Sequence, residues 1–313
     1  MKIGNTDINS FKIGNTTVNK IYSGTKQVFP NVSLDLSTAS NAYSLRKLRT
    51  LYTGYAIKVR RASDNSEQDI GFSGSQLDIA SINSFCSGTN GFVTIWYDQS
   101  GNANNAIQTT SSNQPQIYDS ITGVYLLNGK PSILYSHALG ATSLAYSNLT
   151  GSASYSVSSV FSAIEATRYT KLLSIGPDAS AAGVWFTINT AGTALEWIDN
   201  DTGFAGNGYN NASGPSVIGN SRIIPDSITT QNILTTVLSS SNAKMFKNGT
   251  EISYRIQRTG NCYTTTGNLI IGNSPNTANK MSGRLQELIV WQSDQASNIS
   301  DINININNFY NTY

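Results

Sequence analysis

The sequence predicts an all-β protein, and its composition and local pattern support this class. Only 12% of the 313 residues are charged, about half of the roughly 25% usual in globular proteins. Polarity comes instead from Ser, Thr, Asn and Gln, and tyrosine outnumbers phenylalanine by 16 to 10. Short β-branched and aromatic runs alternate with Gly, Asn and Ser clusters along the chain. This alternation is typical of strands joined by turns.

The composition also argues against several functions. The net charge of +2 gives no electrostatic basis for binding nucleic acid or an anionic membrane surface. One His and two Cys argue against a zinc site or a His-based catalytic triad, so we expect no metal and no cofactor. Cys86 and Cys262 could pair, but two buried free thiols are the favoured interpretation.

The start of the chain gives no sign of export. Met1-Lys2 leads into Ile-Gly-Asn-Thr and not into an apolar segment, so no signal peptide is expected. No run approaches the roughly 18 apolar residues of a membrane span. The low charge and the Asn, Ser and Tyr content nevertheless suit an extracellular particle. A virion component that is made in a host cytoplasm and released by lysis would satisfy both observations.

Residues 1–30 contain an internal repeat. The segment 2–9 recurs as 12–19 at an offset of ten residues, and a looser copy follows at 21–28. Each copy places a glycine turn between β-prone pairs, which predicts small hairpins. Thirty residues cannot bury a core alone. They either complete the main sheet as a ribbon or, as we favour, attach the protein to a larger assembly. The attachment residues would be Ile3, Ile8, Ile13, Val18, Ile21, Tyr22 and Val28.

The pattern of residues 13–28, Ile-Gly-Asn-Thr-x-Val-x-Lys-Ile-Tyr-x-Gly-x-x-x-Val, resembles the N-terminal segment of bacteriophage tail and fibre proteins. The resemblance implies a homotrimer that docks on phage capsid or tail proteins through residues 1–30. The break at Phe29-Pro30-Asn31 then separates this segment from a main domain over residues 31–313.

Two helices and a polar loop are expected early in the main domain. Residues 40–51 show an i, i+3 apolar stripe that predicts a capped helix, with Arg46, Lys47 and Arg49 on its solvated face. A second short helix is expected over 77–85. The three acids of the loop at 64–69 fit no standard calcium-loop spacing.

The stretch 91–102 combines a strand with a turn. Phe92 to Tyr97 is aromatic and β-branched, which predicts a largely buried strand, and the residues from Asp98 onward form a turn. The Asp98 carboxylate is expected to accept backbone N–H bonds and fix this turn, with contact to a sugar as the lesser alternative. We use the following residues as markers of the fold: Trp96, Asp98, Gln99 and Gly101.

Later segments predict more strands and a final helix. Asn248-Gly249 is typical of a type I′ hairpin turn, and Gly283 to Trp291 alternates before becoming fully apolar. Residues 299–310 place apolar side chains at helical spacing. Trp96, Trp185 and Trp291 lie in apolar strands and are assigned to the core.

Several motifs occur in the order found in another family. They are Ala42-Tyr43-Ser44-Leu45-Arg46, Tyr52-Thr53-Gly54, Val59 to Asp64, Asp69-Ile70, Phe85 to Gly88 and Trp96 to Gly101. Over roughly residues 38–135 the chain resembles the catalytic domain of arabinofuranosidase B-type α-L-arabinofuranosidases. The order of motifs from Phe246 to the terminal helix resembles laminin-G-like domains. Both resemblances imply a two-sheet, concanavalin-like jelly-roll sandwich with a few short helices.

The resemblance to the arabinofuranosidases weakens where their active site is expected. A retaining glycosidase needs two carboxyl groups about 5 Å apart. The strand that corresponds to the family's nucleophile motif, 182–188, contains no acid. Leu172-Leu173 stands where the family has adjacent cysteines, and Cys86 lacks the partner that the family places after it. The acids in the plausible region are Glu165, Asp178, Glu196, Asp199, Asp201 and Asp226.

These departures lead us to expect a protein that is not an enzyme. The favoured function is a virion surface protein, a head or tail fibre or capsid decoration, whose sandwich binds host or environmental glycans. The alternatives are a glycoside hydrolase of arabinofuranosidase type and a free carbohydrate-binding lectin.

Overall fold

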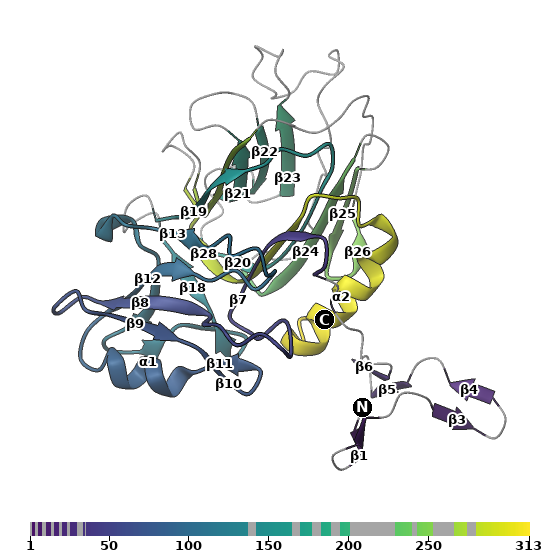
Figure 1. Ribbon diagram of the computed structural model, residues 1–313, viewed down its shortest axis with the longest axis horizontal. Helices are drawn as coiled ribbons and strands as arrows, with labels where there is room; N and C mark the ends of the chain where they lie inside the picture. The colour runs from purple at the N-terminus through teal and green to yellow at the C-terminus, as the bar shows by residue number, and fades with distance from the viewer. Residues whose placement is uncertain are drawn as a thin grey trace.

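The computed structural model confirms an all-β sandwich with few short helices (Figure 1). It describes residues 34, 36–136, 142–164, 170–176, 183–188, 195–200, 229–239, 243–252, 266–273 and 280–313, together with short strands between residues 2 and 29. No helix in these ranges is long and apolar enough to cross a membrane.

The first sheet is built around one long strand, β28 (Gly283–Trp291). β28 pairs on one side with β7 and on the other with β20, and the sheet continues through β24, β25 and β26. All these pairings are antiparallel. The bounds are β7 (Ala39–Ser44), β20 (Tyr155–Ala163), β24 (Asn232–Leu238), β25 (Ala243–Lys247) and β26 (Thr250–Glu251).

The second sheet runs in the order β9-β8-β12-β13-β19-β27-β21-β22-β23. It joins the first sheet because β14 (Gln116–Asp119) pairs with β12 and with β18 (Ile133–Tyr135), and β18 pairs with β28. Its strands are β9 (Glu67–Ile70), β8 (Ile57–Arg61), β12 (Gly91–Trp96), β13 (Ala106–Ile107), β19 (Leu144–Leu149), β27 (Gly267–Ile271), β21 (Thr170–Gly176), β22 (Gly183–Ile188) and β23 (Leu195–Asn200).

Short ribbons decorate this frame. β10 (Phe72–Ser73) pairs with β11 (Gln76–Leu77), β16 (Leu126–Leu127) with β17 (Lys130–Pro131), and β15 (Gly123–Val124) with β14. The predicted strand at 92–97 is β12, and Trp96 and Trp291 are fully buried as predicted. The side chain of Trp185 lies outside the described residues.

The main core lies between the two sheets, and a second core lies under the terminal helix. Inward positions of β20 such as Val157 and Phe161 belong to the main core. Val160, which is on the other face of β20, packs with the helix α2 (Ile299–Tyr310). The predicted helix over 299–310 is therefore confirmed, and its stripe of Ile302, Ile306 and Tyr310 is buried. Figure 1 shows α2 lying across β24 on the outside of the first sheet.

The predicted helix at 40–51 is wrong, and β7 occupies its first part. All six residues of β7 are buried, because β28 pairs with it and α2 covers one of its faces. A strand that is buried on both faces does not need to alternate apolar with polar residues. Its apolar residues can therefore fall at helical spacing, as they do here. The short helix expected over 77–85 is confirmed as α1 (Ile79–Phe85), capped by the Asp78 side chain.

The interpretation of Arg46 as a solvated residue is also wrong. Its guanidinium is buried and forms a fork with the Glu287 carboxylate of β28, with Nε–Oε2 at 2.7 Å and Nη2–Oε1 at 3.0 Å. Ser44 and Tyr310 donate hydroxyl hydrogen bonds to the same carboxylate. Burial alone would lower the pKa of Arg46, but the charge of Glu287 raises it above its usual value.

The N-terminal repeat forms three antiparallel hairpins, as predicted. They are β1 (Lys2–Ile3) with β2 (Thr6–Asp7), β3 (Phe11–Ile13) with β4 (Thr16–Val18), and β5 (Ile21–Ser23) with β6 (Lys26–Phe29). The cross-strand pair Ile3↔Thr6 recurs at the ten-residue offset as Ile13↔Thr16 and Ser23↔Lys26. Each hairpin is a separate two-stranded sheet, and β6 contacts α2.

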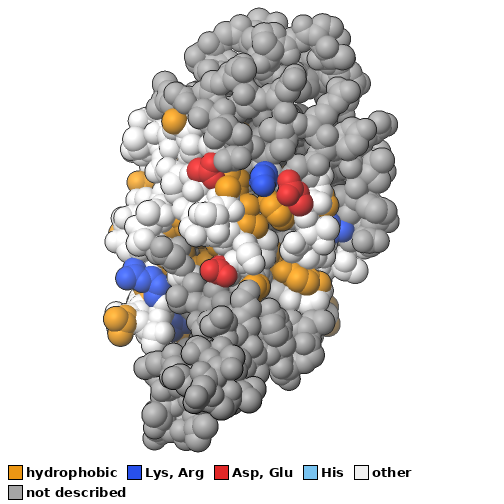
Figure 2. Space-filling model, turned by 90° about the vertical axis from the view of Figure 1, so that its right-hand side faces the viewer, with side chains coloured by type: hydrophobic (Ala, Val, Ile, Leu, Met, Phe, Trp, Pro, Cys, Tyr) orange, Lys and Arg blue, Asp and Glu red, His pale blue; other side chains and the backbone are white. Residues whose placement is uncertain are grey.

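The predicted type I′ turn is present at Asn248-Gly249, where both residues have positive φ (50° and 77°). It joins β25 to β26 on the side of the molecule that faces the viewer in Figure 2. Among the residues coloured there, charged side chains are few, and near the centre of the view a basic side chain lies beside an acidic one.

Cys86 is a buried free thiol at the end of α1. A Cβ atom on Gly91 of β12 would lie 2.6 Å from the Cys86 Sγ, so glycine at this position leaves room for the sulfur. Burial raises the pKa of the Cys86 thiol to about 11. Cys262 lies outside the described residues.

We expect Glu287→Ala to lower the free energy of unfolding by about 3–5 kcal/mol, because it leaves the Arg46 guanidinium buried without its counter-charge. Urea denaturation measures the change. Glu251→Ala is the control, because Glu251 lies 4.0 Å from Lys244 with 44% of its side chain exposed; it should cost about 1 kcal/mol or less. Equal effects of the two substitutions would contradict the role given to Glu287.

The Cys86 thiol should resist alkylation by iodoacetamide at pH 8 in the folded protein and react once urea unfolds it. The folded state holds the thiol proton up to about pH 11, whereas an unfolded thiol loses it near pH 8.5. Stability should therefore fall as pH rises through this interval. Rapid labelling of Cys86 at pH 8 without denaturant, located by peptide mass spectrometry, would contradict this.

Candidate active site

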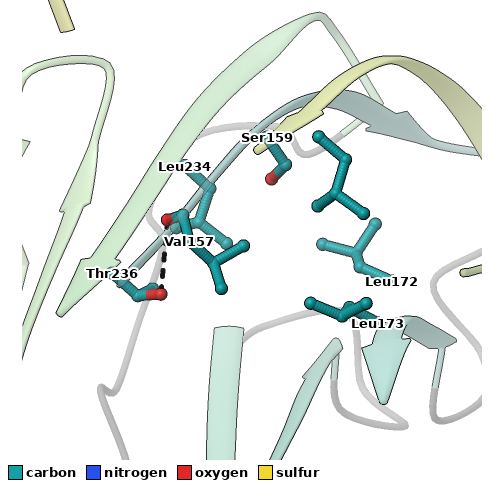
Figure 3. Close-up of a pocket in the computed structure, with 7 residues that line it drawn as sticks. Val157, Ser159, Leu172, Leu173, Leu234 and Thr236 are labelled. Atoms are coloured by element: carbon teal, nitrogen blue, oxygen red, sulfur yellow. Dashed lines mark hydrogen bonds between the residues drawn. The ribbon is translucent and has the colours of Figure 1, made fainter. Parts of the chain in front are cut away.

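A small pocket lies between the two sheets, where β20 and β24 of the first face β21 of the second (Figure 3). Its cavity volume is about 10 Å³, room for about one water molecule and far below the roughly 300–1,000 Å³ of sites for drug-sized ligands. As it stands in this structure, the pocket is therefore too small for a sugar ring. Its lining is Val157, Ser159, Leu172, Leu173, Leu234, Thr236 and Leu288.

A β-bulge gives the pocket its apolar wall. Successive residues of a regular strand point to opposite faces, yet Leu172 and Leu173 both line the pocket. The register of β21 against β22 shifts between Lys171 and Leu173, which places Leu172 at the bulge. Bulges of this kind redirect side chains and are frequent beside active sites. Nothing in the periodicity of residues 170–176 predicts this bulge.

The pocket itself carries no charge. Ser159 and Thr236 supply its hydroxyl groups, and the Thr236 hydroxyl donates to the carbonyl oxygen of Val157 at 3.4 Å. Catalytic carboxylates would have to come from outside this lining. Among the described residues, no group of three or more His, Cys, Asp or Glu side chains could hold a metal ion.

Two of the acids predicted from the sequence lie on β23, next to β22. Glu196 is opposite Thr187 and Asp199 is opposite Val184 in the register of these strands. Positions three apart on a strand are about 10 Å apart and belong to opposite faces, so Glu196 and Asp199 cannot form a catalytic pair with each other. The side chains of all six candidate acids lie outside the described residues. Four of these acids lie outside them entirely: Glu165, Asp178, Asp201 and Asp226.

The Asp98 turn ties the two sheets together. Asp98 is 4% exposed, and its Oδ1 accepts the backbone N–H of Ala42 at 2.8 Å and that of Ser100 at 2.9 Å. Its Oδ2 accepts the Ser100 hydroxyl at 2.6 Å and the N–H of Asn104 at 3.0 Å. Because Ala42 belongs to β7 and Asp98 follows β12, this carboxylate joins one sheet to the other. Its acceptor sites are occupied by the protein.

The other marker residues serve the same junction. The Gln99 side chain donates to the carbonyl oxygens of Ser44 and Arg46 and accepts the N–H of Leu48. Gly101 has a φ of +106°, which favours glycine, and lies against the Arg49 guanidinium. Trp96 is buried against Tyr43, with ring centroids 5.8 Å apart.

Nothing that the structure describes brings the seven predicted attachment residues near the N-terminus to this pocket. Ile3, Ile13, Val18, Ile21, Tyr22 and Val28 lie on strands of the hairpins, but their side chains lie outside the described residues, and so does the whole of Ile8. The predicted homotrimer, the partners of residues 1–30 and the glycan partners stay predictions.

Comparisons with known proteins extend this picture. Residues 37–124 match the family model described as alpha-L-arabinofuranosidase B, catalytic. A probable alpha-L-arabinofuranosidase B of Aspergillus flavus is 38% identical over 95 residues, which cover 27% of this chain and 19% of that protein. Alpha-L-arabinofuranosidase B of Aspergillus oryzae matches at the same identity and coverage. The chain thus spans about a fifth of the length of these relatives.

Solved structures share the fold over most of the chain. An arabinofuranosidase complexed with arabinofuranosyl-α-1,2-xylobiose superposes with a TM-score of 0.59 and 18% identity, covering 85% of this chain and 62% of that one. A mutant GH54 α-L-arabinofuranosidase soaked with 4-nitrophenyl α-L-arabinofuranoside gives a TM-score of 0.59 and 17% identity at the same coverage. At these identities the likeness establishes the fold, including the two-sheet architecture.

These findings correct the expected function. The prediction of a bacteriophage virion surface protein, a head or tail fibre or capsid decoration, is wrong, and so is the virion location, because the matching family and the relatives named above are arabinofuranosidases. The prediction that the chain is not an enzyme is overturned by the same matches. It gave three local departures more weight than the family match over residues 37–124.

We expect Asp98→Ala to lower the free energy of unfolding by about 3 kcal/mol or more, because buried N–H groups on both sheets lose their acceptor. Asp64→Ala is a matched control. Asp64 accepts the N–H and hydroxyl of Ser66 in the same i, i+2 arrangement, but it is exposed. Its loss should change the urea midpoint far less. A midpoint for Asp98→Ala as close to wild type as that of the control would show that the junction does not depend on Asp98.

Proposed function

We propose that this chain is a glycoside hydrolase of the α-L-arabinofuranosidase type. The observation that carries the proposal is the 38% identity over 95 residues to arabinofuranosidase B. Within the family match at 37–124 lie β7, Asp98 and its turn, so the matched segment includes the residues that join the two sheets. The fold likeness then extends beyond the matched segment to 85% of the chain.

The proposed chemistry needs two carboxyl groups. In a retaining mechanism one carboxylate attacks the anomeric carbon while a carboxylic acid protonates the departing glycosidic oxygen. Water then hydrolyses the glycosyl–enzyme ester with the second group acting as base. In support of the proposal, Glu196 and Asp199 belong to β23, which follows the pocket strand β21 and its neighbour β22 in the order of the second sheet. Only one of them can serve, and its partner would come from the remaining acids.

Where the sequence departs from the family pattern, the proposed site would differ from that of the arabinofuranosidases. β22 has no acid in its sequence, so the nucleophile would be provided by β23 or by a residue further along the chain. Leu172-Leu173 replaces a polarisable cysteine pair by two branched apolar side chains. The wall at this position would therefore be hydrocarbon.

The test is release of 4-nitrophenol from 4-nitrophenyl α-L-arabinofuranoside. We expect the wild-type chain to release it, and one of Glu196→Gln, Asp199→Asn and Asp201→Asn to lower kcat by about a hundredfold or more. Glu67→Gln, which changes an exposed acid of β9, should retain wild-type activity. Release by the wild type no faster than in buffer would refute the proposal.

A further inference from the structure

We propose that the outer face of the second sheet, at its β8–β9 end, binds a neutral saccharide chain at a site separate from the pocket. The face is formed by Tyr52, Tyr55, Lys58, Asp69 and Tyr97, which we call the tyrosine surface. Lys58 and Asp69 are cross-strand neighbours on β8 and β9. The next positions, Ile57 and Ile70, are fully buried on the core side, so strand alternation directs Lys58 and Asp69 outward.

Aromatic rings gather over this part of the sheet. The rings of Tyr55 and Tyr97 have centroids 6.1 Å apart, and Tyr55 is 49% exposed. Tyr52 meets the ring of Phe72 edge-on at 6.2 Å and donates its hydroxyl to the Tyr55 carbonyl oxygen at 2.9 Å. Aromatic side chains with polar tips suit surfaces that bind amphipathic partners.

One glycine leaves room for the Tyr52 ring. A Cβ atom on Gly54 would lie 2.5 Å from the Tyr52 hydroxyl oxygen, so no larger residue fits there without moving the ring. A Cβ atom on Gly71 would be 3.7 Å from the Tyr55 ring, an ordinary van der Waals contact, so this ring lies over the chain between β9 and β10. The hydrogen bond from Tyr52 to the Tyr55 carbonyl oxygen and the ring contacts limit the motion of these side chains, which reduces the entropy lost on binding.

Polar groups beside the rings match the hydroxyl edge of a sugar. The Tyr97 hydroxyl donates to Asp69 Oδ1 at 2.6 Å, and Lys58 Nζ lies 3.8 Å from the same oxygen. Asp69 Oδ2 accepts no hydrogen bond from the part of the chain that the structure describes, so it is open to a ligand hydroxyl. The side chains of Lys58 and Asp69 are 27% and 32% exposed, so both remain within reach of a ligand.

A saccharide fits this combination better than a charged partner does. A pyranose or furanose ring offers an apolar C–H face to an aromatic ring and hydroxyl groups at its rim. Here the aromatic rings adjoin one carboxylate and one ammonium, which neutralise each other and give no net attraction for a charged polymer.

The tyrosine surface does not extend the candidate active site. Four strands, β12, β13, β19 and β27, separate β8 from β21, which corresponds to about 24 Å along the sheet. The pocket lies on the inner face and the tyrosines on the outer face. Such a second anchor favours a polymeric substrate over a free arabinoside, and the choice of an arabinose-bearing polymer rests on the proposed function.

The experiment is affinity gel electrophoresis of the full chain in native gels containing soluble wheat arabinoxylan. We expect retardation of the wild type and a dissociation constant raised about fivefold or more by Tyr55→Ala. Tyr313→Ala is a matched control, because Tyr313 is 44% exposed on the other side of the fold, against Gly249. It should bind like the wild type. Asp69→Asn gives a second, conservative variant, and it should also weaken binding.

The outcomes separate this proposal from the proposed function. If arabinoxylan retards the wild type more than Tyr55→Ala but 4-nitrophenyl α-L-arabinofuranoside is not hydrolysed, the hydrolase proposal fails and the tyrosine surface stands. If Tyr55→Ala lowers polymer binding and leaves kcat on the arabinoside unchanged, the surface acts apart from catalysis, as proposed. Absence of retardation, or equal retardation of Tyr55→Ala and wild type, overturns the saccharide site and assigns the face to another class of partner.

Discussion

The structure depends on the buried carboxylate of Glu287 in the middle of β28. This strand pairs with β7 and β20 and, through β18, connects the first sheet to the second. A charge at such a position is tolerated only if it is fully paired. Arg46 provides two N–H donors, and Ser44 and Tyr310 provide hydroxyl groups. The same contacts hold α2 against the sheet, since Arg46 also donates to Asn305 and lies over the Phe309 ring.

Asp98 repeats this principle at the other junction of the sandwich. Both carboxylates accept a hydrogen bond from β7. Glu287 of β28 accepts the Ser44 hydroxyl, and Asp98 in the turn after β12 accepts the Ala42 N–H. β7 is thus fixed between two buried acids. The hydroxyl group of its buried Ser44 is satisfied by Glu287, whereas that of Ser40 donates to the carbonyl oxygen of Val290 on β28. Charged residues are few in this chain, and two of them, Glu287 and Asp98, fix how the sheets are joined.

The sequence predicted those elements that depend on residues close together in the chain. The Asn248-Gly249 turn requires two positive φ values, the ten-residue repeat requires a recurring hairpin, and the stripe of Ile302 and Ile306 requires a helix; all are present. Residues 39–44 were misread because their burial is decided by β28 and α2, more than 240 residues along the chain. The partner of Arg46 could not be predicted for the same reason. The bulge at Leu172 depends on the register with β22 and leaves no trace in the periodicity.

The segment that matches the arabinofuranosidases and the candidate catalytic acids lie in different parts of the chain. The part of the chain most like the arabinofuranosidases builds the sheet junctions, whereas the acids of the proposed chemistry lie on β23 and beyond. The inner face of the second sheet offers a small apolar pocket at one end, and its outer face offers tyrosines at the other. A hydrolase that anchors a polymer at one place and cleaves a side chain at another would use both.

Covalent trapping of the nucleophile tests the central claim most directly. A cyclic sulfate analogue of α-L-arabinofuranose is an electrophile that a catalytic carboxylate opens, and the resulting ester stays attached. Intact-protein mass spectrometry should show one adduct per chain, and peptide mapping should place it on an acid of β23 or of the residues that follow it. No mass increase, under conditions that label an active arabinofuranosidase completely, would show that this sandwich carries no glycosidase nucleophile.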